Sequence, residues 1–335
     1  MRRALPVLVG LLAALGCGDK PTLVVYSPHG VEMLGEFEKL YEAKYPGANV
    51  DWQDLGSETC LQRIQTERGR PLADVWWGGP AELFDTAAAE GLLEPYRPTW
   101  ADQVERRHLH PQGLWAATFE TYEAIVYNGK LLQREQAPKG WDDLLDERWK
   151  GKVVIRAPLA SGTMRTIFAA MIAREVQRAG SEQAGFEWLR KLHRNTKAYA
   201  VDPNQLNQML ARGEGVVTLW NLTDAILQRT RYGFPFDFVL PEEGQPVVPE
   251  GIAIVKGAPH AGEARRFYEF VTSKDALLTQ ARDFFRIPVR RDLANEEKPE
   301  WLRGLKLVPL DVDQDLMRKK TREWMTEWDR TVKGG

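Results

Sequence analysis

Short apolar runs alternate with amphipathic stretches along almost the entire chain. The runs have the length of buried strands, and the stretches carry apolar residues three and four positions apart, as helices do. This alternation predicts an α/β fold with parallel, doubly wound sheets. The predicted strands are Leu23–Tyr26, Asn49–Gln53, Asp74–Trp77, Leu114–Phe119, Ala124–Asn128, Lys152–Ile155, Val216–Trp220, Phe236–Val239 and Ile252–Val255.

The chain has 335 residues, which is enough for two lobes of ordinary size. Residues 118–132 form two strand-like pieces with no helix between them, and residues 241–255 hold three prolines before a new strand. Both segments suit a chain that crosses between two lobes. We therefore expect residues 22–118 and 245–300 to form lobe one, residues 119–244 to form lobe two, and residues 301–335 to form a helical tail.

The N-terminus has the features of an export signal. Arg2 and Arg3 precede a short apolar stretch, Ala4–Leu15, which ends just before Cys17. We expect residues 1–16 to be a lipoprotein signal peptide and Cys17 to carry the lipid. The alternative is an ordinary secretory signal that is cut near the same point, and both predict a protein in the periplasm or at the cell surface. Because no later segment offers 18 consecutive apolar residues, the lipid would be the only membrane anchor.

Composition and motifs argue against several functions. The formal charge is −2, from 45 basic and 47 acidic residues that are interspersed, so the chain lacks the basic footprint of a nucleic-acid binder. No Walker-type loop, GxGxxG motif or nucleophile–base pair emerges. We therefore expect neither an enzyme nor a resident cofactor.

The most informative pattern is a small polar or glycine cluster that ends a strand and begins a helix. Such a turn presents free backbone N–H groups and the positive end of a helix dipole at the carboxyl edge of the sheet, where open α/β sheets bind ligands. Five turns of this kind, divided between two lobes, could converge on one anion. Their candidate ligand-binding residues are Ser27, His29, Ser57, Glu58, Thr59, Gly78, Gly79, Ser161, Gly162, Thr163, Trp220 and Asn221.

Each candidate also has a structural interpretation. Every turn could be a simple helix cap, and Asn221 with Asp224 three residues later is a good capping pair. His29 could hydrogen-bond an anion or, with Glu58, ligate a metal. Trp220 could line the cleft or belong to the core. Arg286 could reach an anion, although a salt bridge at a helix end is the favoured interpretation.

Six stretches in order along the chain resemble a known family. They are LVVYSPHGVEMLGEFEKLYEAKYPGANV, GSETCLQRIQTERGRPLADVWWGG, GLLEPYRP, AIVYNGKLL, GWDDLLDERWKGKVVIRAPLASGT and MLARGEGVVTLWN. Together they resemble the extracellular solute-binding proteins of bacterial ABC importers, in the branch that holds ferric-iron, phosphonate and sugar-phosphate binders. The resemblance covers residues 22–300. It implies a type II periplasmic-binding clamshell, in which a hinge closes two lobes on a ligand that is then handed to a permease in the inner membrane.

The resemblance also limits which ligands the protein is expected to bind. Iron binders of this branch use a histidine in the first turn, a glutamate in the second, and adjacent tyrosines in the second lobe. His29 and Glu58 match the first two places, but Trp220 and Asn221 stand where the tyrosines would be. We therefore expect the ligand to be a small organic anion of the sugar-phosphate or phosphonate type. We expect the protein itself to be a monomer. The alternatives are a ferric-iron receptor and an exported sensor that signals to a membrane partner.

Overall fold

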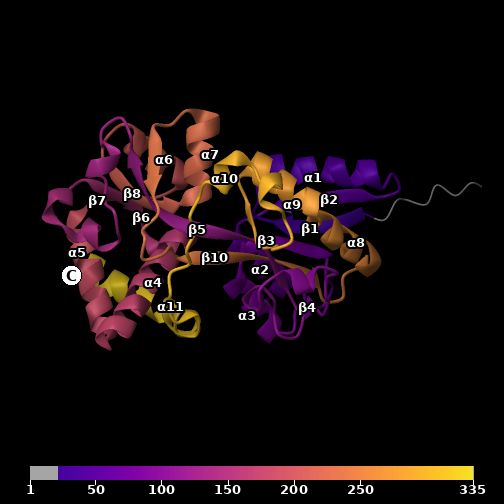
Figure 1. Cartoon of the computed structure of the whole chain (residues 1–335). Coiled ribbons are helices and arrows are strands. Elements are labelled where there is room, and N and C mark those ends of the chain that lie inside the picture. The colour runs from indigo at the N-terminus through magenta and orange to yellow at the C-terminus, as the bar shows by residue number, and fades with distance from the viewer. Residues whose placement is uncertain (1–21, 335) are drawn as a thin grey trace, which may run out of the picture.

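A computed structural model describes residues 22–334 (Figure 1). The predicted signal peptide and Cys17 lie outside the described residues. One mixed sheet runs through the molecule in the order β2-β1-β3-β10-β5-β8-β6-β7, while β4 pairs with β10, and β9 and β11 pair with β5. The strands are β1 (Thr22–Ser27), β2 (Asn49–Asp54), β3 (Val75–Pro80), β4 (Leu93–Glu94), β5 (Ala116–Asn128), β6 (Val153–Arg156), β7 (Thr196–Ala200), β8 (Val217–Asn221), β9 (Phe236–Val239), β10 (Val247–Val255) and β11 (Ile287–Pro288).

Helices cover both lobes of this sheet (Figure 1). They are α1 (Val31–Lys44), α2 (Ser57–Thr66), α3 (Ala81–Ala89), α4 (Gly162–Ala179), α5 (Glu182–Asn195), α6 (Pro203–Ala211), α7 (Leu222–Tyr232), α8 (Ala261–Val271), α9 (Lys274–Phe284), α10 (Glu300–Arg303) and α11 (Gln314–Trp328). The predicted α/β class with two lobes is therefore confirmed. Among residues 22–334, no helix combines the length and the apolar character that a membrane crossing requires.

Two long strands connect the lobes. β5 is buried along all 13 of its residues and unites the two predicted pieces Leu114–Phe119 and Ala124–Asn128 in one strand. Its first half pairs antiparallel with β10, and its second half pairs antiparallel with β8 and β9. The outer pairs β1–β2, β1–β3 and β6–β7 are parallel, as predicted. The crossing strands run against their neighbours because each carries the chain from one lobe to the other.

Separate hydrophobic cores lie on the two sides of these crossing strands. One core surrounds β1 and β3 and is rich in aromatic rings, with Trp76 stacked on Phe84 at 3.9 Å between ring centres. Another lies beneath α4, α5 and α11, where Trp328 meets Phe168 edge to face at 5.4 Å. The C-terminal helix therefore contributes buried side chains to this second core.

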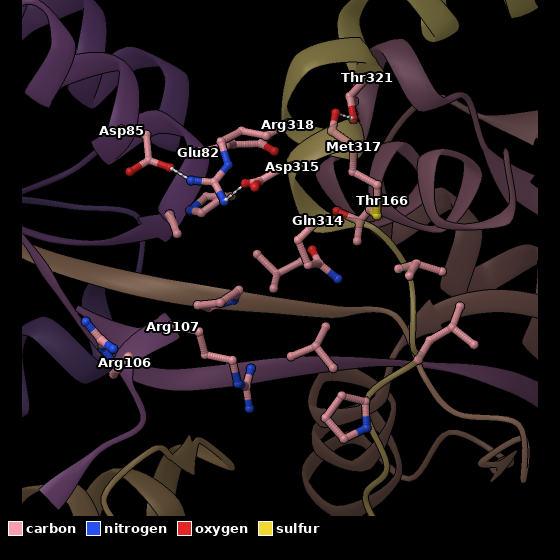
Figure 2. A pocket seen from close by; sticks show the side chains of 18 of the residues that line it. Glu82, Asp85, Arg106, Arg107, Thr166, Gln314, Asp315, Met317, Arg318 and Thr321 are labelled. Atoms are coloured by element: carbon pink, nitrogen blue, oxygen red, sulfur yellow. Dashed lines mark hydrogen bonds and ion pairs between the residues drawn. The ribbon is translucent and has the colours of Figure 1, made fainter. Parts of the chain in front are cut away.

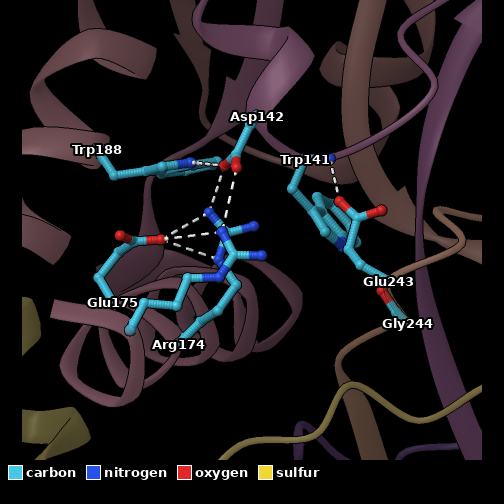
Figure 3. A network of polar contacts seen from close by, with 8 residues as sticks. Trp141, Asp142, Arg174, Glu175, Trp188, Glu243 and Gly244 are labelled. Carbon is cyan, nitrogen blue, oxygen red and sulfur yellow. Dashed lines mark hydrogen bonds and ion pairs between the residues drawn. The ribbon is translucent and has the colours of Figure 1, made fainter.

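A polar network fixes the loop that precedes β6 (Figure 3). Asp142 accepts hydrogen bonds from the Trp188 indole at 2.7 Å and from the Arg174 guanidinium, whose side chain is buried. Burial opposes the charge on Asp142, but Trp188 and Arg174 hold the pKa of this carboxyl below its usual value. Trp141 is held next to it, because its indole donates to the Gly244 carbonyl at 2.9 Å.

Candidate functional site

A helix follows each of the five predicted turns. The turns after β1, β2 and β3 begin α1, α2 and α3, and the turns around residues 160–163 and 221 begin α4 and α7. Figure 1 shows α1, α2 and α3 in the lobe at one end of the crossing strands, and α4 and α7 in the lobe at the other end. The N-terminal ends of helices from both lobes therefore flank the region where the paired strands β5 and β10 pass from one lobe to the other.

His29 is packed against the third turn. A Cβ atom added to Gly78, whose φ is +100°, would lie 2.3 Å from His29 Cε1, so only glycine leaves room for the imidazole. The ring also contacts Trp77 edge to face at 5.0 Å and Phe119 at 5.2 Å between centres. Burial, and then the charge of Arg286, hold the pKa of His29 well below its usual value of 6.5. Its Nε2 atom is buried without a hydrogen-bond partner among the described residues.

Ser57 and Gly79 meet in the same way. A Cβ atom on Gly79, with φ of +109°, would lie 3.2 Å from the Cβ of Ser57 and 3.3 Å from its hydroxyl oxygen. Ser57 is the first residue of α2, and Thr59 lies in the same turn of this helix. The N-cap residue Gly56 provides no side-chain hydrogen bond. The backbone N–H groups at the start of α2 are therefore available to a ligand.

The helices of the second lobe begin differently. The Ser161 hydroxyl accepts a hydrogen bond from the Met164 N–H at 3.3 Å, and Asn221 Oδ1 accepts from the N–H groups of Thr223 at 2.9 Å and Asp224 at 3.1 Å. Ser161 and Asn221 thus cap α4 and α7. Gly162 is exposed and Thr163 is half-buried in the first turn of α4.

Two further candidates have clear structural roles. Ser27 is fully buried, and its hydroxyl accepts from the His29 N–H at 3.3 Å, which shapes the first turn. Trp220 is 6% exposed and packs in a hydrophobic cluster with Leu222 and Ile226.

Glu58 takes part in a contact between the lobes. Its carboxylate lies 3.2 Å from the Arg165 guanidinium of α4, and the same guanidinium lies 3.8 Å from Glu82 of α3. Arg318 of α11 pairs with Asp85 of α3 at 2.9 Å in a similar way. Within residues 22–334 no group of three or more His, Cys, Asp or Glu side chains is arranged to hold a metal ion.

The structure adds three carboxylates that were not among the predicted ligand-binding residues. Glu250 of β10 accepts a hydrogen bond from the Gly79 N–H at 2.8 Å and one from the Thr121 hydroxyl at 3.3 Å. Glu123 of β5 is fully buried, and Asp224 lies in the first turn of α7. Burial raises the pKa of all three carboxyl groups. The available signal for Glu123 was a second glutamate, three residues after Glu120, inside the apolar run of β5. Nothing in the local sequence identifies the residues that lie next to it in space.

A cavity of about 630 Å³ lies beside this region, between α3 and α11 (Figure 2). Residues 247–249 of β10 form part of its lining, and Arg318 extends along its wall between Asp85 and Asp315. None of the predicted ligand-binding residues lines this cavity.

Two α/β lobes, two connecting strands and helix N-termini that face one region define a clamshell binding protein. Residues 70–316 match the model of the bacterial extracellular solute-binding protein family, and the chain belongs to this family. A probable ABC transporter periplasmic-binding protein of Sinorhizobium fredii is 26% identical over 93% of this chain and 87% of its own length. A putative 2-aminoethylphosphonate-binding periplasmic protein of Salmonella typhimurium is 27% identical over 76% of this chain and 74% of its own.

Solved structures agree with this assignment. The periplasmic binding protein AfuA from Actinobacillus pleuropneumoniae, with fructose-6-phosphate bound, has a TM-score of 0.76 and 27% identity over 93% of this chain and 98% of its own. Iron-bound HitA from Pseudomonas aeruginosa has a TM-score of 0.77 and 21% identity over 91% of this chain and 98% of its own, which shows the shared fold. The protein is the substrate-binding component of an ABC importer, and its relatives are periplasmic or extracellular.

Proposed function

We propose that the protein captures a small phosphorylated organic anion, of the sugar-phosphate or phosphonate type, between its lobes and delivers it to a permease in the inner membrane. It would act as a monomer without a cofactor or catalytic activity. After removal of residues 1–16, the lipid on Cys17 would keep it at the membrane. The lobes would comprise residues 22–118 with 245–300 and residues 119–244, and the helical tail residues 301–335.

The observation that carries this proposal is the uncapped start of α2. Its first N–H groups have no side-chain acceptor among the described residues, and the Ser57 side chain packs against Gly79, whose own N–H donates to Glu250. A helix N-terminus with free N–H groups and a hydroxyl is a suitable site for phosphate oxygens. His29 could add a neutral N–H donor, since its Nε2 atom has no partner among the described residues.

The two lobes would contribute unequally to binding of the anion. Ser57 and Thr59 would hold the anion from the first lobe, where Gly78 and Gly79 leave room for the side chains of His29 and Ser57. Gly162 and Thr163 would approach it from the second lobe, while Ser161, Trp220 and Asn221 would shape that wall. Glu58 would act through its contact with Arg165, which joins the lobes around the bound solute.

The relatives support the same ligand class. One is named for 2-aminoethylphosphonate and another was solved with fructose-6-phosphate, and both compounds are small organic anions that contain phosphorus. The ferric-iron alternative has weaker support. The carboxylate of Glu58 already pairs with Arg165, and Trp220 and Asn221 offer no phenolate oxygens.

Thermal unfolding of the mature protein, after removal of any bound solute, tests the proposal. Aminoethylphosphonate, fructose 6-phosphate, inorganic phosphate, a tricarboxylate and ferric citrate form the panel. A phosphorus compound present at 100 times its dissociation constant should stabilise the protein by about 2.7 kcal/mol and raise the melting temperature. No shift with any phosphorus compound, together with a coloured ferric complex, would contradict the proposal.

A further inference from the structure

Glu123 is a buried acid that forms no ion pair with any described residue, although the Thr163 side chain lies close enough to favour its charged form. Its side chain is 0% exposed, and neither carboxylate oxygen has a hydrogen-bond partner among residues 22–334. Leaving a buried carboxylate unpaired is costly, so such a group in a native protein points to a missing partner or to a function. Glu123 lies on a crossing strand and pairs by its backbone with Asn221, at the start of α7. It is therefore located where the two lobes meet.

The neighbours of Glu123 carry the same charge. The charges of Asp224 and Glu250 add to burial in raising the pKa of Glu123, while the nearby Thr163 side chain favours the charged form. Arg286 is the cation close to this group, because its charge lowers the pKa of both Asp224 and Glu250. Its guanidinium lies over the Phe119 ring at 5.2 Å, and its Nε atom has no hydrogen-bond partner within residues 22–334. If all three acids were ionised, they would give the cluster a formal charge of 1 − 3 = −2 with the one guanidinium, and their raised pKa values show that the site resists this charge without a bound cation.

Two structural explanations do not account for this cluster. In the part of the chain that the structure describes, Glu123, Asp224 and Glu250 form no ion pair within 4.0 Å, so they are not an internal salt-bridge network. The described residues also offer no group of three or more potential ligands with the geometry for a metal ion. An organic cation has looser requirements, since an ammonium group has three donors that can reach carboxylates at different angles.

We infer that the solute carries a protonated amine in addition to its anionic group, and that Glu123, with Asp224 and Glu250, binds this ammonium. The inference rests on the proposed function, which places the anionic group at the start of α2. Glu250 joins the two subsites, because one of its oxygens accepts the Gly79 N–H while the carboxylate lies within electrostatic reach of Glu123. The cleft would therefore select a zwitterion.

Titration calorimetry on the mature protein tests the inference with two matched probes, aminoethylphosphonate and ethylphosphonate, which differ by the amine. The wild type should bind the amine-bearing probe at least about tenfold more tightly, since hydrogen bonds to charged groups have that magnitude. Glu123→Gln should remove most of this ratio while keeping the affinity for ethylphosphonate. Aminoethylphosphonate binding should also release protons, seen as heats that change with the ionisation enthalpy of the buffer, because a bound cation lowers the pKa of nearby carboxyl groups.

Glu120→Gln is the matched control. Glu120 lies on the same strand but is engaged by Tyr122 at 3.0 Å and by His108 at 2.9 Å, so its loss should leave the probe ratio unchanged. Asp224→Asn is a second variant that should lower the ratio. Equal affinity for the two probes, or an unchanged ratio in Glu123→Gln, would overturn the inference while leaving the proposed function intact.

The remaining outcomes are also decisive. Tighter binding of fructose 6-phosphate than of aminoethylphosphonate, lost in Glu123→Gln, would show that the carboxylates bind hydroxyl groups and would overturn the ammonium assignment. Failure of all three probes and of inorganic phosphate would overturn the proposed function and this inference together.

Discussion

At Ser57 a substitution by proline can remove one backbone N–H donor while α2 remains intact. It is the first residue of α2, where proline is well tolerated, and the preceding Gly56 has φ −60° and ψ 147°, which are compatible with a following proline. Ser57→Pro eliminates an N–H group and the hydroxyl, whereas Ser57→Ala eliminates only the hydroxyl. We expect calorimetry to show a larger loss of affinity for the phosphorus ligand in the proline variant, by about tenfold. Equal losses would mean that the N–H of residue 57 does not bind the anion.

Glu123 should affect stability in a pH-dependent way. Burial raises its folded-state pKa well above the usual 4.5, so the folded protein retains a proton that the unfolded chain loses as the pH rises. The contribution of Glu123 to stability is therefore fully present below about pH 4.5 and is lost as the pH rises through the folded-state pKa. Glutamine does not titrate, so the stability advantage of Glu123→Gln should grow with pH and reach about 1–3 kcal/mol near neutral pH.

Urea unfolding of both proteins at acid and neutral pH measures this difference. Glu242→Gln, at an exposed position, controls for the chemical change itself. A stability difference that stays constant with pH, or that favours the wild type at neutral pH, would contradict the account. A more stable but less selective variant is the result expected when a binding group is buried at a cost to the fold.

The candidate residues were only partly predictable from the sequence. The turn at Ser27–Gly30 begins with the last residue of β1, and Gly78 and Gly79 lie among the last residues of β3. The local pattern was therefore sufficient to propose both as the ends of strands. Glu123 and Glu250 escaped prediction because their significance depends on neighbours that are distant in the chain, such as Thr163 and Gly79. The roles of Ser161 and Asn221 as caps were among the alternatives that local pattern left open.

The strands, like the candidate residues, were predictable only where the local sequence pattern was sufficient. Strands with long apolar runs were predictable, but β7 (Thr196–Ala200) was missed because it is short, carries Lys197 and pairs with only one neighbour, β6. β5 was split into two predictions because Glu120 and Glu123 interrupt its apolar pattern. Its continuity comes from pairing with β10, β8 and β9, which no local pattern reveals.

Helix α11 should be required for the stability of the second core. Trp328 is fully buried and contacts Phe168 at 5.4 Å and Tyr199 at 5.7 Å between ring centres. Trp328→Ala should lower the free energy of unfolding by about 3–5 kcal/mol in urea, through lost burial and the resulting cavity. The control is Tyr232→Ala, since Tyr232 is 58% exposed, and it should cost less than about 0.5 kcal/mol. A loss below about 1 kcal/mol for Trp328→Ala would show that α11 is not part of this core.

The lobes are joined by charged contacts as well as by strands. Arg165 of α4 reaches Glu58 and Glu82 on the facing lobe, and its side chain is 25% exposed. Partly exposed pairs contribute up to about 1 kcal/mol each, so Arg165→Gln should weaken solute binding by about three- to tenfold at low salt and by less at high salt. Arg190→Gln removes a pair within α5 and is the control. Equal calorimetric affinities for the two variants would show that Arg165 does not stabilise the closed arrangement.

An electron-density map of the protein, purified without unfolding so that it keeps its cargo, would test the binding site and the ligand class together. The account predicts tetrahedral density within hydrogen-bond distance of the N–H groups that begin α2, beside Ser57 and Gly79. It also predicts that an amine of the bound solute lies within hydrogen-bond distance of the Glu123 carboxylate. A solute in the cavity between α3 and α11, or a metal ion on His29 without an anion at α2, would contradict it.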